Sequence, residues 1–373
     1  MFRSILTGLA LLGAATTTTA QTAAPVINVD QVNYNVLDFG VYFLGSERQG
    51  QKFVAGATNQ FYDRTRPTMI YIHGWQNGAT QAQRRETFDR VEAQTSTDFA
   101  QVWRSRGWNV GICYWNQFAD EGEVKDAEAK VWSANGPRGM RWRNASGAYS
   151  TGPAKSAATL CTESLAPALT NFTGTQLRLV GHSLGSQMVI NVGMQLSDRV
   201  DAGTLPARAR PGRIALLDPA FLRDARPYLN NRWTGEVARG IVSHLKTKGV
   251  IFESYRSSGA TSNGFIGDAN IELLNMTAFT ELVSSYYQLW QFGQKHEHAV
   301  WHYLWSMDFA PRPIDRPAGS PPLHPADVMA VAPSAATEDY RVRAQMNGNL
   351  RTIHNQGRNS RTPGDDSFTL ANK

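Results

Sequence analysis

The chain has 373 residues, enough for one large α/β domain with additions or for two smaller domains. Its formal charge of +6 would attract anionic surfaces, but the basic residues are scattered, which argues against a nucleic-acid-binding protein. The two cysteines, Cys113 and Cys161, are too few for a disulfide scaffold, so the fold must depend on its hydrophobic core. Whether they pair with each other stays open at this point.

The first 20 residues have the pattern of a cleaved secretory signal. Arg3 precedes an apolar stretch from Ile5 to Ala15, and small residues lead to Ala20, where we expect cleavage. We therefore expect a secreted protein, extracellular or, in a Gram-negative bacterium, periplasmic. No segment approaches the about 20 apolar residues that a membrane-spanning helix needs, so we expect no transmembrane segment.

Strand and helix patterns alternate from Thr68 onward, which predicts an α/β fold with a mostly parallel central sheet and helices on both faces. Residues Pro25 to Gly45 alternate like antiparallel strands at one side of that sheet. The predicted strands are Thr68–Ile72, Trp108–Tyr114, Gln176–Gly181, Arg213–Leu217, Val250–Tyr255 and Asn270–Leu274. The predicted helices are Ala82–Arg106, Ala154–Thr170, Ser186–Asp198, Glu236–Lys246, Thr277–Phe292 and Ala299–Met307.

Composition divides the chain after the last predicted helix. We expect a catalytic domain over residues 21–310 and a Pro- and Ala-rich C-terminal extension over residues 311–373, which packs on that domain or trails from it.

A Gly-x-Ser-x-Gly sequence, Gly181 to Gly185, lies between a predicted buried strand and a predicted helix. In that context it is typical of a nucleophile elbow, a sharp turn that lifts one hydroxyl above the sheet edge. We therefore predict that Ser183 is a catalytic nucleophile and that the Leu184 N–H faces the oxyanion. A second oxyanion donor is expected from the N–H of Trp75, which follows the first strong strand in the sequence His73-Gly74-Trp75.

An activated serine needs a histidine base, which in turn is held by an acid. Asp218 ends the strand after the nucleophile strand, and Pro219 is expected to keep it extended, with its carboxylate at the same edge as Ser183. Glu253 and Asp268, near the ends of later strands, are the alternative acids.

Three histidines, His296, His298 and His302, are candidates for the base. A base is expected in a loop just before a final helix, which favours His298 ahead of Ala299–Met307, with His296 as the alternative. The cluster also raises the possibility of a metal site. However, the zinc-protease pattern HExxH fails at Val300, so we expect neither a metal nor a cofactor.

With these residues, the chain resembles the pancreatic-type lipase family of the α/β-hydrolase superfamily. The likeness rests on "YIHGW", "GHSLG", "ALLDPAF" and a histidine followed by an aromatic-rich helix, and it covers Thr68 to Asp308. The resemblance implies an acid directly after the strand next to the nucleophile strand, which favours Asp218. Two cysteines cannot form the several disulfides of that family, and the tail after Asp308 is expected to be too short for its C-terminal lipid-binding β-sandwich.

These patterns predict a secreted serine hydrolase, a carboxylic ester hydrolase of the triacylglycerol lipase type that acts on acyl lipids. The alternatives are a phospholipase A1, a soluble carboxylesterase or, from another class, a non-catalytic lipid- or surface-binding protein on the same fold. Two segments, Asn116–Gly152 and Arg256–Ala269, leave carboxyl ends of strands and are expected to overhang the site, as a mobile flap or as an ordinary packed excursion.

Overall fold

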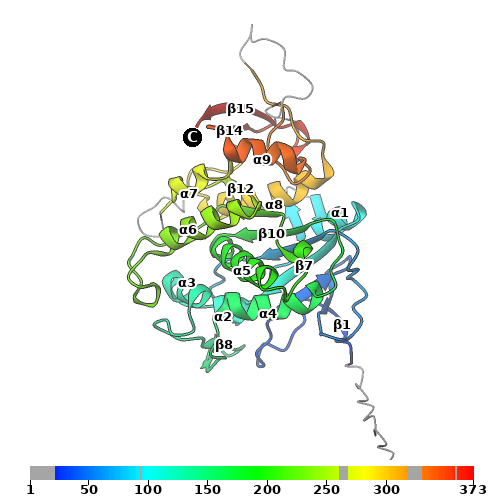
Figure 1. Cartoon of the computed structure of the whole chain (residues 1–373), viewed down its shortest axis with the longest axis vertical. Coiled ribbons are helices and arrows are strands. Elements are labelled where there is room, and N and C mark those ends of the chain that lie inside the picture. The colour runs from blue at the N-terminus through cyan, green and yellow to red at the C-terminus, as the bar shows by residue number, and fades with distance from the viewer. Residues whose placement is uncertain (1–21, 93–94, 260–267, 317–329, 358) are drawn as a thin grey trace, which may run out of the picture.

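The computed structural model describes residues 22–92, 95–259, 268–316, 330–357 and 359–373. Within that part of the chain, one large sheet runs through the molecule in the order β1-β3-β2-β7-β4-β10-β11-β12-β13-β14-β15 (Figure 1). Its strands are β1 Val26–Asn28, β2 Gly40–Leu44, β3 Gln49–Lys52, β4 Thr68–Ile72, β7 Asn109–Tyr114, β10 Leu177–His182, β11 Arg213–Leu217, β12 Ile251–Arg256, β13 Ala278–Glu281, β14 Leu350–Asn355 and β15 Ser367–Asn372. The predicted signal segment, residues 1–20, lies outside the described residues.

The centre of the sheet is parallel from β7 to β14, and its two edges are antiparallel. The five strands predicted between Thr68 and Tyr255 are confirmed to within one residue, as is the antiparallel N-terminal edge. Nearly every side chain of the five central strands is buried, as in parallel strands covered on both faces, although β11 and β12 also carry the buried charged residues Arg213 and Glu253.

Helices cover both faces of the sheet, as predicted. The longer helices are α3 Val124–Trp132, α4 Ala157–Leu169, α5 Leu184–Asp201, α6 Thr234–Thr247, α8 Phe292–Trp305 and α9 Asp339–Asn347, and the shorter ones are α1 Phe99–Ser105, α2 Asn116–Ala119 and α7 Ile271–Asn275. Alternate side chains of β4 point to opposite faces of the sheet and belong to different hydrophobic clusters. Ile70 and Ile72 pack with α4 and α5, whereas Met69 and Tyr71 pack with α1 and α8.

The helix predicted over Ala82–Arg106 is wrong. The structure has a hairpin of β5 Asp89–Glu92 and β6 Thr95–Asp98, followed by the short helix α1. Three consecutive hydroxyl residues, Thr95 to Thr97, disfavour a helix there. Asp98 then caps α1 by accepting a hydrogen bond from the Gln101 N–H.

The assignments over residues 270–292 are also wrong. The predicted strand Asn270–Leu274 is helix α7, and the predicted helix Thr277–Phe292 contains β13 instead. Ala278–Glu281 pairs in parallel with β12, and this backbone pairing outweighs the helical spacing of the apolar residues Phe279, Leu282, Val283, Tyr286 and Trp290. Helix α8 then begins at Phe292, seven residues before the predicted start.

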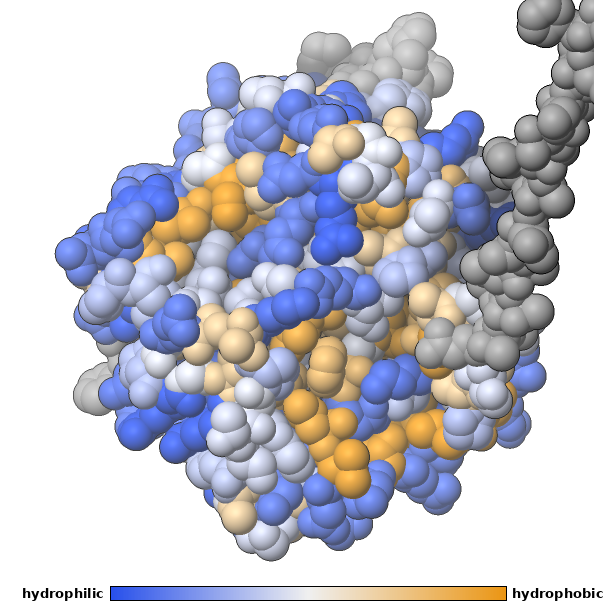
Figure 2. Space-filling view, turned by 60° about the horizontal axis from the view of Figure 1, so that its bottom comes forward, coloured by the Kyte–Doolittle hydropathy of each residue, from blue (hydrophilic) through white to orange (hydrophobic). Residues whose placement is uncertain are grey.

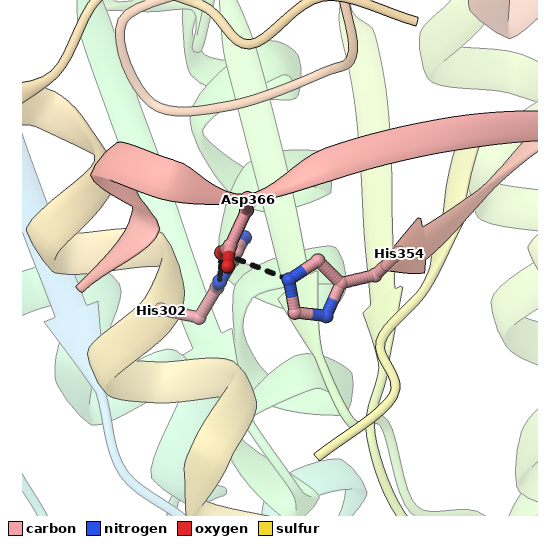
Figure 3. Close-up of side chains that lie close together, drawn as sticks. All are labelled: His302, His354 and Asp366. Atoms are coloured by element: carbon pink, nitrogen blue, oxygen red, sulfur yellow. Dashed lines mark ion pairs between the residues drawn. The ribbon is translucent and has the colours of Figure 1, made fainter. Parts of the chain in front are cut away.

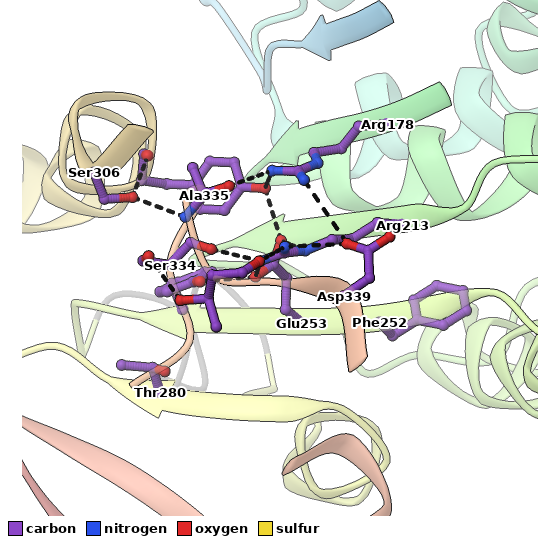
Figure 4. Close-up of polar contacts among 12 residues, drawn as sticks. Arg178, Arg213, Phe252, Glu253, Thr280, Ser306, Ser334, Ala335 and Asp339 are labelled. Atoms are coloured by element: carbon purple, nitrogen blue, oxygen red, sulfur yellow. Dashed lines mark hydrogen bonds and ion pairs between the residues drawn. The ribbon is translucent and has the colours of Figure 1, made fainter. Parts of the chain in front are cut away.

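The C-terminal segment is built into the sheet. Strands β14 and β15 extend the sheet beyond β13, and two buried arginines from the central strands reach carbonyl groups of the same segment (Figure 4). Arg178 donates to the Ala335 carbonyl at 2.8 Å, and Arg213 donates to the carbonyls of Ser334 and Thr337 at 2.6 and 2.8 Å.

Cys113 and Cys161 form a disulfide that joins β7 to α4, with the Cα atoms 6.2 Å apart. Two small hairpin strands, β8 Trp142–Arg143 and β9 Tyr149–Ser150, lie on the loop that follows α3. The described part of the chain contains no helix with the length and apolar character to cross a bilayer. On the face that Figure 2 shows, hydrophobic residues form patches separated by hydrophilic ones.

Candidate active site

Ser183 stands at the turn between β10 and α5, with a strained backbone of φ 56° and ψ −123°. Its amide donates to the Leu217 carbonyl at 3.0 Å, which fixes the turn above the end of β11. The side chain lies on the wall of a cavity of about 670 Å³. The predicted elbow is thus confirmed as a backbone conformation.

The two glycines of the elbow are required by close packing. A Cβ atom at Gly181 would lie 2.2 Å from the Gly185 carbonyl oxygen, and one at Gly185 would lie 2.0 Å from the Ile72 carbonyl oxygen. Such separations are far inside van der Waals contact, so the turn accepts no side chain at either position.

Asp218 follows β11 at the same sheet edge, fully buried. Its backbone differs from the extended conformation expected before Pro219: φ is 41°, and its amide donates to the Tyr255 carbonyl at 2.6 Å. The carboxylate accepts hydrogen bonds from the amides of Ser257 and Ser258 at 2.8 and 3.2 Å and from the Ser258 hydroxyl. These donors hold the carboxylate in one orientation.

His296 is the histidine that meets this carboxylate. Its Nδ1 lies 2.5 Å from Asp218 Oδ2, and its ring lines the same cavity as Ser183. The side chain is 21% exposed, so the other ring nitrogen can face a substrate. This arrangement fixes the tautomer, with the proton on Nδ1 and a free lone pair on Nε2.

The preference for His298 as the partner of Asp218 is wrong. His298 is completely buried, and neither of its ring nitrogens has a hydrogen-bond partner in the described structure. Its ring packs edge-on against Trp301, with centroids 4.1 Å apart. The error follows from the helix boundary: α8 begins before His296, so the two histidines point to different sides of one helix.

Two further groups position this site and were not identified from the sequence. His182, directly before Ser183, has its Nε2 3.1 Å from the His296 carbonyl, and the centroids of the two rings are 4.4 Å apart. Burial holds the pKa of His182 well below its usual value, so the ring is neutral and donates this bond. Ser257 and Ser258, which hold Asp218, follow the predicted strand Val250–Tyr255 after one intervening residue, and that position is the signal that could have found them.

The predicted oxyanion donors lie around Ser183. A Cβ at Gly74 would be 2.6 Å from the Ser183 Cβ, so the loop that carries the Trp75 amide approaches Ser183 closely. In the described structure, the N–H groups of Trp75 and Leu184 donate to no protein acceptor. His73 stays structural: burial lowers its pKa to about 4, and its ring stacks on Trp115.

The cavity beside Ser183 is formed by the segment from Gly74 to Arg90, by Phe99 and by one face of α8. Its wall mixes apolar and charged side chains: Trp75, Phe99, Val300, Trp301 and Leu304 with Arg84, Arg85, Glu86, Asp89, Arg90 and Glu297. Burial raises the pKa of Glu86 to about 7, and the charge of Glu297 adds to that shift.

The segment Asn116–Gly152 does not line this cavity. Met140 and Trp142 are buried in the core, and Arg141 and Arg143 pair with Glu121 and Asp120. The packed-excursion alternative is therefore the correct one for these residues. Of the second expected segment, residues 260–267 lie outside the described residues.

The alternative acids are engaged elsewhere. Glu253 forms a buried ion pair with Arg213 and accepts hydrogen bonds from the hydroxyls of Tyr255 and Tyr303 at 2.8 and 2.7 Å. Asp268 caps the backbone at Asn270. Among the described residues, His302, His354 and Asp366 lie close enough together to hold a metal ion. None of the three lines the cavity beside Ser183.

The parallel sheet, the elbow after β10 and the acid after β11 make this an α/β-hydrolase fold. No protein-family model and no curated protein matches the chain. Among solved structures, the chain is similar to a lipase-esterase related protein from Clostridium acetobutylicum ATCC 824, with 9% identity, 64% of this chain and 91% of that chain covered, and a TM-score of 0.29. It is also similar to an inhibited esterase B from Lactobacillus rhamnosis, with 13% identity, coverage of 64% and 75%, and a TM-score of 0.27.

Proposed function

We propose that this protein is a secreted serine hydrolase that cleaves carboxylic esters of acyl lipids, as a triacylglycerol lipase does. The observation that carries the proposal is the hydrogen bond of His296 to Asp218, on the wall of the cavity that Ser183 also lines. Together these groups are the nucleophile, base and orienting acid of a serine hydrolase.

The reaction follows from the roles of these groups. Ser183 Oγ attacks the ester carbonyl while His296 Nε2 takes its proton, and the Asp218 carboxylate stabilises the imidazolium. The amides of Trp75 and Leu184 bind the oxyanion of the tetrahedral intermediate. His296 then gives the proton to the leaving alcohol, and a water molecule releases the acyl group by the same route in reverse. These reaction steps require no cofactor.

Exposed apolar side chains next to the cavity support a lipid substrate over a soluble ester. Leu289, Trp290 and Phe292 are 81%, 73% and 52% exposed, and they stand on the chain directly before the α8 residues that line the cavity. Trp and other large apolar side chains in such positions suit a lipid–water interface.

The exposed Arg84 on the cavity wall favours a second candidate, a phospholipase A1, because a guanidinium can pair with a lipid phosphate. Secretion is supported by the signal-like N-terminus and by the Cys113–Cys161 disulfide, which suits an oxidising compartment. N-terminal sequencing of the mature protein tests cleavage after Ala20.

A fluorophosphonate probe tests the hydrolase itself. The protein should be labelled on Ser183 and should hydrolyse nitrophenyl esters, whereas Ser183→Ala should lose labelling and roughly 10⁶-fold in turnover. Folded protein that neither labels nor hydrolyses any ester would instead support the non-catalytic binder.

The substrate class needs a separate comparison. Activity is measured on soluble nitrophenyl butyrate, on emulsified triacylglycerol and on phosphatidylglycerol vesicles, for the protein and for a variant with Leu289, Trp290 and Phe292 all changed to serine. A lipase should lose activity on the emulsion and keep it on butyrate. Equal activity of both proteins on the emulsion favours a soluble carboxylesterase, and a preference for vesicles that Arg84→Gln abolishes favours the phospholipase.

A further inference from the structure

Three metal-binding side chains from distant parts of the sequence meet on the side of α8 that faces the C-terminal strands (Figure 3). His302 comes from α8, His354 from β14, and Asp366 directly precedes β15. One ligand atom from each lies within 4.8 Å of the others, and all three residues are at most 3% exposed.

The protein leaves part of this cluster without hydrogen bonds. His302 Nδ1 and His354 Nε2 both lack a hydrogen-bond partner among the described residues, although they lie 3.8 and 2.8 Å from Asp366 Oδ2. His298, four residues before His302 on α8, is completely buried, and both of its ring nitrogens lack partners. Buried polar atoms are normally satisfied, so their concentration here indicates a missing ligand.

The ring positions of His302 and His354 match one shared ion. The centroids of His298 and His302 are 5.7 Å apart, those of His302 and His354 are 5.1 Å apart, and those of His298 and His354 are 6.1 Å apart. Three imidazoles around a tetrahedral zinc with the usual Zn–N distance would have centroids about 5 Å apart. The His302–His354 separation matches this value, whereas both separations from His298 are larger, so its ring would have to turn toward the ion to bind it.

We propose that His302, His354 and Asp366 bind a structural Zn²⁺ ion, with His298 as the fourth ligand. Four buried protein ligands leave no open position, so the ion would link α8 to the C-terminal strands and take no part in ester cleavage. Imidazole and carboxylate donors in a redox-neutral tetrahedral site favour zinc over calcium, which takes oxygen ligands.

Metal binding has one local consequence. The Val283 amide donates to His354 Nδ1 at 3.3 Å, so Nε2 carries the ring proton when no metal is bound. A zinc ion on Nε2 moves that proton to Nδ1, so the Val283 amide must turn away. An NMR shift of this amide on zinc addition is therefore an expected signature.

The test uses the full purified protein, with its zinc content measured after dialysis and its melting temperature recorded. One zinc per chain is expected, with a lower melting temperature after removal by a strong chelator and recovery on adding zinc chloride. A protein that retains no zinc, and whose melting temperature neither chelator nor zinc changes, would overturn the proposal and leave a plain contact between His354 and Asp366.

Variants assign the ligands. His302→Gln and His354→Gln should lose stoichiometric zinc, and His298→Gln should bind it at least about tenfold more weakly. His244→Gln, on the exposed side of α6, is the matched control and should bind normally. Unchanged zinc affinity in His302→Gln refutes the site. If the ligand variants do not fold, X-ray absorption spectroscopy of the zinc-loaded wild type identifies the ligands instead. A zinc coordination sphere without imidazole nitrogen would contradict the assignment.

Discussion

The two sides of helix α8 differ in what they face. One side, with His296, Val300 and Leu304, lines the cavity next to Ser183. The other side, with His298 and His302, is buried against the C-terminal strands. Residues two apart on a helix are separated by about 200° around its axis, so histidines that are near neighbours in sequence enter different environments. Which of them can act as a base is decided by the first residue of the helix, not by the histidine pattern.

The largest difference between the two sides of α8 is expected when each histidine is substituted in turn. His296→Ala should lose roughly 10⁶-fold in ester turnover, because the serine then has no base. His298→Gln should stay within about tenfold of the wild-type rate, since this side chain does not reach the cavity. Both rates are measured on nitrophenyl butyrate, after circular dichroism shows that each variant is folded. A larger loss in His298→Gln than in His296→Ala would reverse our assignment.

A substitution at Asp218 tests whether its carboxylate positions His296 on the cavity side of α8. Asp218→Asn keeps the shape but removes the charge that fixes the His296 tautomer, so kcat should fall roughly 10⁴-fold. Steady-state kinetics on the same ester check this value, with Asp268→Asn as the control that should keep its activity. Equal losses in the two variants would mean that the carboxylate next to His296 has no special role.

A substitution at Arg213 tests how strongly the C-terminal segment, on the other side of α8, is anchored to the central sheet. Arg213→Met would leave the Glu253 carboxylate buried and unpaired and would free the carbonyls of Ser334 and Thr337. We expect the free energy of unfolding to fall by about 3–5 kcal/mol in urea denaturation. Arg232→Met, at an exposed site, should change it by less than about 0.5 kcal/mol. A similar small change in both variants would show that the C-terminal segment does not depend on this anchor.

The smallest effect is expected from Glu86 on the cavity wall. Its raised pKa means that the folded state favours the protonated acid, so this stabilisation is complete below the usual glutamate pKa and is lost as pH rises through about 7. The melting temperature of the wild type, relative to Glu86→Gln, should therefore decrease from about pH 5 to about pH 7. Parallel curves for the two proteins would show that Glu86 titrates normally.

The elbow and its strands could be predicted because their signals are local. Gly181, Ser183 and Gly185 must occur at fixed spacing for the turn to form, and each central strand is a short apolar run with turn residues at its ends. Asp218 follows from the same reasoning, because parallel strands present their carboxyl ends at one edge.

The failures have a common cause in pairing across long sequence distances. Apolar residues from Phe279 to Trp290 recur at helical spacing, yet Ala278–Glu281 forms a strand because it pairs with β12. Ser257 and Ser258 can donate their amides to the Asp218 carboxylate only because β12 lies beside β11, a neighbour relation that the local sequence does not specify.

By itself, the sequence determined that a serine would stand on a strained turn at the end of a buried parallel strand, with an aspartate after the next strand. Only the tertiary structure decided which histidine meets that aspartate, and that His302, His354 and Asp366 lie together. The physical reason is that turn geometry depends on a few adjacent residues, whereas the direction of a helical side chain depends on where the helix begins and on what packs against it.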